Sequence, residues 1–234
     1  MRRNMSPGDA KTLKDDFLMQ DIRLAYQAVK EVPWGKSIPQ DIFLNNVLPY
    51  ASLNERRDDW RRDFHRRFIR IAVKAGTIDR AVLILNKYVF ETLHVSYNIN
   101  KRPKPDQSPY ESMQAHYASC TGLSILLTDA LRSVGIPARI AAVPMWPDNS
   151  GNHTWVEIWD GRWHYVGAGE SSSLDQAWFT RKASHMDRRH RIYAASFKRT
   201  NLIFPMRWAP DLNFVSAVDV TKNYQMDRQS KNRR

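Results

Sequence analysis

The chain contains a single cysteine, Cys120, among its 234 residues. Cys120 opens a segment whose leucines and alanines recur at helical spacing, and Gly135 stands where a left-handed helix end is expected. A free cysteine is often a small, inert member of the core. At a helix N-terminus, however, unpaired N–H groups and the helix dipole stabilise a thiolate. Cys120 is therefore a candidate nucleophile, and a lone cysteine excludes an internal disulfide.

A cysteine nucleophile needs a general base, and two histidines are candidates. His153 opens the segment 153–159, whose residues alternate as in a strand, and His164 lies on the segment 162–167. The Asp-Gly pair between these segments predicts a tight turn, so the second segment returns antiparallel to the first. The strand period alone does not choose between His153 and His164.

Strand alternation determines which side chains accompany His153. It puts His153, Trp155 and Glu157 on one face of the strand. A helix packed on this face would bring Cys120 within hydrogen-bond reach of the imidazole. We therefore expect the Cys120 helix to cover the His153 face.

The elements around these residues predict an α+β fold. Apolar spacing indicates helices over 12–30, 57–74 and 78–93, before the Cys120 helix. Three prolines favour an extended surface loop over 101–112. Strands are expected over 138–146, 153–159 and 162–167, with a further strand-like segment at 215–224. The order gives a helical N-terminal region and a central helix packed on an antiparallel sheet.

No repeat or low-complexity linker interrupts the chain, and we expect three regions. Residues 1–100 form a helical lead-in packed on the core, and 101–200 form the catalytic core. Residues 201–234 form a C-terminal extension, which we expect to lead into a further domain.

The net charge of +12 comes from 36 Lys and Arg against 24 Asp and Glu. The basic residues concentrate in 56–74, 181–193 and 227–234. In the first segment Trp60, Phe64, Phe68 and Ile71 share one helical face, so we expect the arginines on the solvated faces. No nucleic-acid-binding motif accompanies the charge, so no specific nucleic-acid partner is expected. An anionic cell-wall or matrix polymer would suit the surface.

The composition predicts neither a membrane span nor a bound metal. No run of about 18 apolar residues exists. The polar start, MRRNMSPGDAKTLKDD, lacks the apolar stretch of a signal peptide. No His, Cys and Asp cluster has metal-ligand spacing, so we expect no cofactor and no metal.

The segments CTGLSILLTDALRSVGIPAR and NHTWVEIWDGRWHYVG together resemble the transglutaminase-like superfamily of papain-type cysteine enzymes. In that family a cysteine begins the central helix, which ends in a Gly-Ile-Pro-Ala-Arg stretch, and a His-x-Trp-x-Glu strand supplies the base. The resemblance covers about residues 105–180. It implies that Cys120 is the nucleophile and His153 the base, on a transglutaminase- or papain-like fold of the bacterial branch.

The third member of the expected triad departs from the family pattern. The family usually has an Asp four residues after the Trp of the returning strand, where this chain has Gly167. The nearest acid downstream is Glu170, which could reach His153 if the strand ends in a bulge. Glu157 and Asp175 are alternatives, although for Glu157 a structural role is favoured, in a pair with Arg139.

An acyl-transfer site also needs donors for the oxyanion. The backbone N–H of Cys120 is one, because it lies in the first helical turn. Gln114 resembles the oxyanion glutamine of papain-type enzymes in its spacing, with a plain surface residue as the alternative. Tyr117 and Trp155 are expected to frame the cleft, unless they belong to the core.

The resemblance implies acyl transfer from an amide or peptide bond through a Cys120 acyl-enzyme. Hydrolysis of a peptide or protein substrate is favoured, because the bacterial members are mostly regarded as peptidases or amidases. One alternative is transglutaminase-type crosslinking. Another is a peptide- or glycan-binding domain that kept the fold, as Gly167 would suggest. A periplasmic or extracellular location is expected by the same resemblance.

Overall fold

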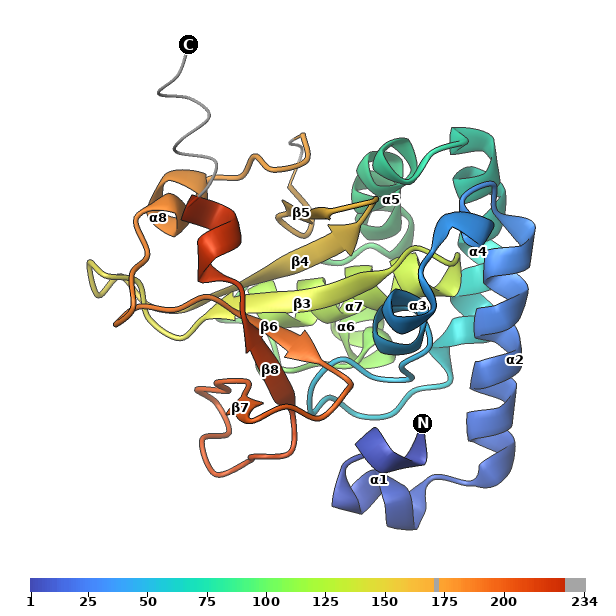
Figure 1. The fold of residues 1–234 in the computed structure, drawn as a ribbon, viewed down its shortest axis with the longest axis horizontal. Coiled ribbons are helices and arrows are strands. Elements are labelled where there is room, and N and C mark those ends of the chain that lie inside the picture. The colour runs from blue at the N-terminus through green and yellow to red at the C-terminus, as the bar shows by residue number, and fades with distance from the viewer. Residues whose placement is uncertain (171–172, 226–234) are drawn as a thin grey trace.

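The computed structural model describes residues 1–170 and 173–225, so the basic tail 227–234 lies outside the described residues. Its helices precede and flank a sheet (Figure 1). The helices are η1 (Arg2–Asn4), α1 (Pro7–Thr12), α2 (Asp15–Glu31), η2 (Gly35–Ser37), α3 (Gln40–Asn46), α4 (Trp60–Ala75), α5 (Ile78–Leu93), α6 (Pro109–Ala115), α7 (Cys120–Ser133) and α8 (Thr180–Ser184). The strands are β1 (Ser96–Tyr97), β2 (Tyr117–Ala118), β3 (Ala138–Val143), β4 (His153–Trp159), β5 (Trp163–Val166), β6 (Tyr193–Ser196), β7 (Leu202–Ile203) and β8 (Ser216–Asp219).

Six of the strands form one sheet in the order β5-β4-β3-β6-β8-β7, and every neighbouring pair is antiparallel. The Asp-Gly turn joins β4 to β5 as expected, with Gly161 in the left-handed region at φ +76°. The short strands β1 and β2 pair in parallel outside this sheet. The α+β architecture predicted from the element order is confirmed.

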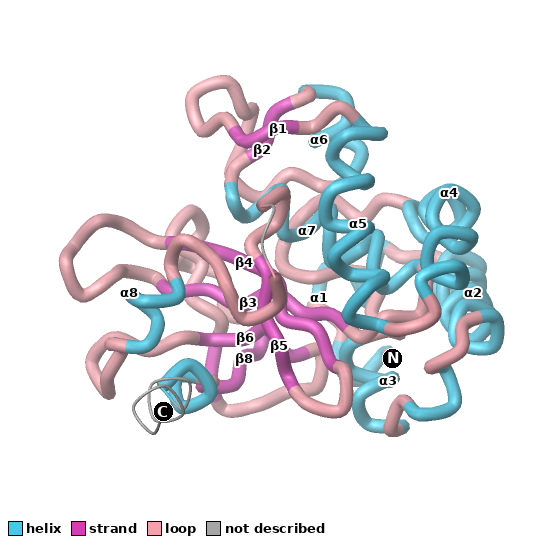
Figure 2. Tube along the Cα trace, turned by 90° about the horizontal axis from the view of Figure 1, so that it is seen from above, coloured by secondary structure: helices cyan, strands magenta, loops and turns pink. Residues whose placement is uncertain are grey.

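Helix α7 lies between the sheet and the helices α4 and α5 (Figure 2). It begins at Cys120 as predicted, and all its other residues are buried. Leu126 and Leu127 belong to a core cluster that joins α4, α5 and β4. The helix ends before Gly135, whose φ of +72° is the predicted left-handed end. Because the rest of α7 is buried, Cys120 stands on a helix that the core holds in place.

The face of the sheet that α7 covers differs from the prediction. It packs on the face of Thr154, Val156 and Ile158, and Thr121 Oγ1 lies 3.1 Å from Thr154 Oγ1. The opposite face, with Trp155, packs on an aromatic cluster instead. Alternation separates the two faces of a strand but does not say which face a helix will cover.

Helix α6 was missed, because its first residues lie in the predicted loop over 101–112. Ser108 and Glu111 form a capping box, in which Ser108 Oγ accepts from the Glu111 N–H and the Glu111 carboxylate accepts from the Ser108 N–H. This Ser-x-x-Glu signal was present in the sequence. The segment 215–224 also differs, because β8 ends at Asp219 and residues 221–225 are helical.

The arginines of α4 are not all solvated as expected. Trp60, Phe64 and Phe68 are buried as predicted, but Arg61 is buried beside them. Its Nε donates to Asp21 of α2 at 2.6 Å, and its Nη1 donates to the carbonyl oxygen of Arg132 in α7 at 3.2 Å. A buried guanidinium is tolerated when it is paired and hydrogen-bonded in this way.

Candidate active site

The first turn of α7 presents Cys120 at a capped helix start. Ser119 is the N-cap, and its Oγ accepts from the N–H of Gly122 at 3.2 Å. The same hydroxyl donates to the carbonyl oxygen of Pro105 at 2.7 Å, which fixes the cap to the preceding loop. Cys120 is half-buried, and its N–H belongs to the first turn, where no intrahelical acceptor exists. A charge forming next to Cys120 would therefore meet an unpaired N–H group.

A cavity of about 760 Å³ opens at this helix start. Cys120, His153 and Glu170, which come from α7, β4 and the turn after β5, all line it. Most of the remaining wall is apolar and is formed by Phe90, Val95, Ser96, Tyr97, Leu123, Thr154, Ala168, Gly169 and Trp178. Cys120 and His153 share the cavity although α7 packs on the other face of β4, because each is the first residue of its element.

His153 lies in an aromatic setting. The ring centroids of Trp178, Phe179 and Trp155 are 4.8, 5.0 and 5.8 Å from that of the imidazole. Burial lowers the pKa of His153 to about 4, because desolvation disfavours the imidazolium ion. His153 Nε2 is buried without a hydrogen-bond partner among the described residues. The imidazole is thus neutral at pH 7 and has a ring nitrogen available for chemistry.

Glu170 returns to the end of β5 through a tight turn rather than the expected bulge. The Glu170 N–H donates to the carbonyl oxygen of Gly167 at 3.2 Å. A Cβ atom at position 167 would overlap with the carboxyl carbon and both carboxylate oxygens of Glu170. The carboxylate therefore occupies the space that a side chain at position 167 would fill, where the family usually has its Asp.

Two features of the surroundings act on the Glu170 carboxyl group in opposite senses. Burial raises the pKa of Glu170, while hydrogen bonds from the backbone and the side chain of Trp178 partly oppose this rise in pKa. Trp178 is 58 % exposed and also contacts the His153 ring, so it links the candidate acid and the candidate base. No pattern in the sequence singled out this tryptophan.

Tyr97 is a second residue of the cavity that the sequence did not indicate. Burial, and after it the charge of Cys120, raise the pKa of Tyr97, so its hydroxyl lies within electrostatic reach of the sulfur. The pairing of β1 with β2 aligns Tyr97 with Ala118, two residues before Cys120. Pairing in parallel between such short strands leaves no periodic signal that could have revealed this.

The other residues expected at the cleft lie away from its lining. Gln114 is exposed on α6. Tyr117 is half-buried, with the Lys101 ammonium 5.0 Å from its ring centroid. Trp155 is fully buried beneath His153, and its Nε1 donates to the hydroxyl of Tyr224 at 2.7 Å. Two of the three contact cavity residues, Trp155 through the ring of His153 and Tyr117 through its strand pairing with Ser96.

The alternative acids have partners elsewhere. Glu157 accepts from Arg139 Nε at 2.7 Å in a buried pair between β4 and β3, as its structural explanation predicted. Asp175 lies 2.7 Å from His164 Nδ1, on the returning strand. Neither carboxylate lines the cavity with Cys120. The structure thus separates the two candidate histidines, with His153 in the cavity and His164 paired outside it.

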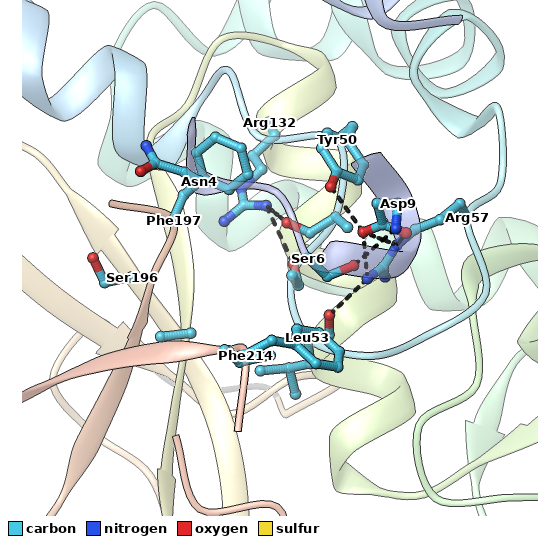
Figure 3. Close-up of a pocket in the computed structure, with 14 residues that line it drawn as sticks. Asn4, Ser6, Asp9, Tyr50, Leu53, Arg57, Arg132, Ser196, Phe197 and Phe214 are labelled. Carbon is cyan, nitrogen blue, oxygen red and sulfur yellow. Dashed lines mark hydrogen bonds and ion pairs between the residues drawn. The ribbon is translucent and has the colours of Figure 1, made fainter. Parts of the chain in front are cut away.

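A smaller cavity of about 40 Å³ lies where the N-terminal segment meets the sheet (Figure 3). Its charged side chains already have partners. Arg57 Nε lies 3.1 Å from both Asp9 carboxylate oxygens, and the Tyr50 hydroxyl donates to Asp9 at 2.8 Å. Arg132 Nη1 donates to the carbonyl oxygen of Ala51 at 2.9 Å. We interpret this cavity as part of the attachment of the N-terminal segment.

No helix in the described parts of the chain combines the length and hydrophobicity that a membrane span requires. Within residues 1–170 and 173–225, no three His, Cys, Asp or Glu side chains are grouped so that they could hold a metal ion.

Comparison with known proteins gives one family match. The family model of the transglutaminase-like superfamily matches residues 69–168, and no curated protein matches the chain. Among solved structures, the chain is similar to a proposed cysteine protease from Cytophaga hutchinsonii, with 15% identity and a TM-score of 0.39. The similarity covers 69% of this chain but only 58% of that one. With the family match and the α7–β4–β5 arrangement together, residues 69–168 are a domain of the transglutaminase-like superfamily.

Proposed function

We propose that the protein transfers the acyl group of an amide or peptide bond to water, through a thioester on Cys120. The observation that carries this proposal is the meeting of Cys120, His153 and Glu170 in one cavity, although they come from a helix, a strand and a turn. The family match supports the reaction class. It ends at residue 168, before Glu170, so the role of this acid rests on the structure alone.

In the first step the imidazole of His153 takes the proton of the Cys120 thiol, and the sulfur attacks the carbonyl carbon. The carbonyl oxygen becomes an oxyanion next to the N–H of Cys120. His153 then gives its proton to the nitrogen as the C–N bond breaks. An amine leaves and a thioester remains.

In the second step a water molecule attacks the thioester while His153 takes one of its protons. The C–S bond breaks, the carboxylic acid is released, and the thiol recovers its proton from the imidazolium. Glu170 would accept a hydrogen bond from the unpartnered His153 Nε2 and stabilise the imidazolium formed in both steps. Catalytic hydrogen bonds of this kind often tighten only when substrate is bound.

The wall of the cavity favours a peptide or protein substrate. It is mostly apolar and aromatic, with Phe90, Tyr97 and Trp178 beside the reactive residues. Such walls bind side chains and exclude water, while a few polar groups orient the reacting bond. A primary amine in place of water would give crosslinking by the same first step.

An activated ester, 4-nitrophenyl acetate, tests this proposal without a known substrate. We expect rapid release of 4-nitrophenolate, an acetyl group on Cys120 in the intact-protein mass spectrum, and then hydrolysis of this thioester. His153→Ala should slow acylation by about a hundredfold or more, because general-base assistance is lost. His164→Ala is the matched control, since His164 is paired with Asp175 outside the cavity, and it should leave the rate unchanged.

Two results would overturn the proposal. One is equal reactivity of the wild-type chain and Cys120→Ala. The other is an equal loss for His153→Ala and His164→Ala. Adding butylamine distinguishes the acceptors: a thioester decay that rises with amine concentration and yields N-butylacetamide would favour transfer to amines over hydrolysis.

A further inference from the structure

Asn86 of α5 contacts the turn that carries Glu170 from behind the cavity. Its side chain is 2% exposed, and the three hydrogen bonds that it forms with described residues all go to this turn. Nδ2 donates to the carbonyl oxygens of Gly167 and Glu170, each at 2.9 Å, and Oδ1 accepts from the N–H of Gly169 at 2.8 Å. Both N–H groups and the oxygen of one buried amide are therefore committed to the four residues 167–170.

The turn has two other kinds of contact, because Ala168 packs against the core cluster and Trp178 forms hydrogen bonds with the Glu170 carboxylate. It follows the last residue of β5, and the hydrogen bond from Glu170 to Gly167 that closes it measures 3.2 Å. Gly169 adopts a φ of +78°, a conformation that favours glycine and leaves this residue without a side chain to pack. Its open side faces the ring of Phe90 on α5. Among the described residues, the side-chain hydrogen bonds to the backbone of this turn come from Asn86.

The position of the Glu170 carboxylate also depends on Gly167. Its φ lies outside the left-handed region, so its backbone does not require glycine. Its lack of a Cβ atom leaves the space that the Glu170 carboxylate fills. The backbone of the turn is held by Asn86, and the side chain of Glu170 fits because position 167 is glycine.

We propose that Asn86 is a positioning residue for the reaction, which holds the 167–170 turn so that the Glu170 carboxylate lies beside position 167, where the family usually has its Asp. This rests on the proposed function of Cys120 and His153. Asn86 does not line the cavity, and it acts only through the turn. Helix α5 thus holds the turn that carries Glu170, and it does so from the side of the turn away from the cavity.

The test compares Asn86→Ala in two backgrounds. The first is the native chain. The second carries Gly167→Asp together with Glu170→Ala, which returns the acid to the residue that follows β5 and is held by the pairing of Val166 with Val156. After acetylation by 4-nitrophenyl acetate, Asn86→Ala should slow thioester hydrolysis about tenfold in the native chain and at most about twofold in the second background.

Two further variants control for loss of packing. Val82→Ala removes buried atoms one turn away on α5 and should lower Tm without slowing hydrolysis. Gly167→Ala leaves Asn86 intact but displaces the carboxylate, and should slow hydrolysis as much as Glu170→Gln does. If the background with Gly167→Asp and Glu170→Ala is itself unreactive, the hydrolysis rate of Gly167→Ala decides whether the position of the Glu170 carboxylate matters.

Three results would overturn the inference: equal slowing by Asn86→Ala in both backgrounds, slowing by Val82→Ala in proportion to its loss of Tm, or unchanged hydrolysis in Gly167→Ala. Failure of the proposed function looks different. In that case the native chain itself shows no acetylation of Cys120 that depends on His153. A chain that is acetylated normally but is indifferent to Asn86→Ala would refute the role of Asn86 alone.

Discussion

His153 lies against Trp178, Phe179 and Trp155, and this setting determines the form of the imidazole at neutral pH. Burial lowers the pKa of His153 to about 4, so the neutral form, which accepts a proton, persists at every higher pH. We expect acylation of Cys120 by 4-nitrophenyl acetate to keep its rate from about pH 7 to about pH 5 and to fall through about pH 4. If His153 had the pKa of an ordinary histidine, the acylation rate would fall through about pH 6.5.

The rate of 4-nitrophenolate release across pH measures this profile. Glu170 titrates in the same cavity with a pKa raised by burial, so Glu170→Gln serves as the control that isolates His153. The acid limb should remain near pH 4 in that variant. A midpoint near pH 6.5 in the native chain would show that His153 is solvated rather than buried.

The residues of the candidate site were predictable to different degrees. Cys120 and His153 carry motifs that lie close together in the sequence, and Glu170 was the nearest acid beyond the glycine in place of Asp. Trp178, Tyr97 and Asn86 carry no such motif. Their positions depend on contacts between elements that are distant along the chain, which residue spacing does not encode.

At the scale of elements, the cap of α7 sets where Cys120 stands. Ser119 Oγ accepts from the N–H of Gly122 and donates to the carbonyl oxygen of Pro105. We expect Ser119→Ala to lower the free energy of unfolding by about 1 kcal/mol, as the loss of a helix N-cap usually does. The midpoint of urea denaturation at constant slope measures this change.

Ser119→Thr is the matched control, because its hydroxyl can make both hydrogen bonds and should retain most of the stability. If alanine and threonine unfold at the same urea concentration as serine, the cap contributes nothing and α7 is held by its packing alone.

Periodicity predicted the elements best where one face is apolar and the other polar. This applies to α2, α4 and α5, whereas β4 and β5 were also marked by the Asp-Gly turn between them. It failed for α6, where prolines obscured the capping box, and for the face of β4 that α7 covers. Both faces of β4 carry large side chains, so the pattern did not distinguish the helix side from the aromatic side.

At the scale of the whole molecule, the charge pattern did not reveal the buried ion pair between Arg61 and Asp21. The sequence places Arg61 within a basic run, which predicted solvent exposure, but the structure buries it between α2, α4 and α7. Composition cannot reveal such an arginine, because its partner Asp21 lies 40 residues away along the chain. The boundary at residue 100 between lead-in and core stays a prediction, and Arg61 offers a way to examine it.

Asp21→Asn should destabilise the whole chain, because it leaves the buried Arg61 guanidinium without its counter-charge. Removing one partner of a buried ion pair costs about 3 to 5 kcal/mol. We expect the urea transition to move to lower concentration in both tryptophan fluorescence and the loss of Cys120 acylation by 4-nitrophenyl acetate. The two should move together, since α4 shares its core with α7. Asp63→Asn, which removes surface ion pairs with Arg66 and Arg67, should change stability by less than about 1 kcal/mol. If the fluorescence transition moves while the loss of Cys120 acylation does not, the helical lead-in unfolds separately from the core that carries the nucleophile.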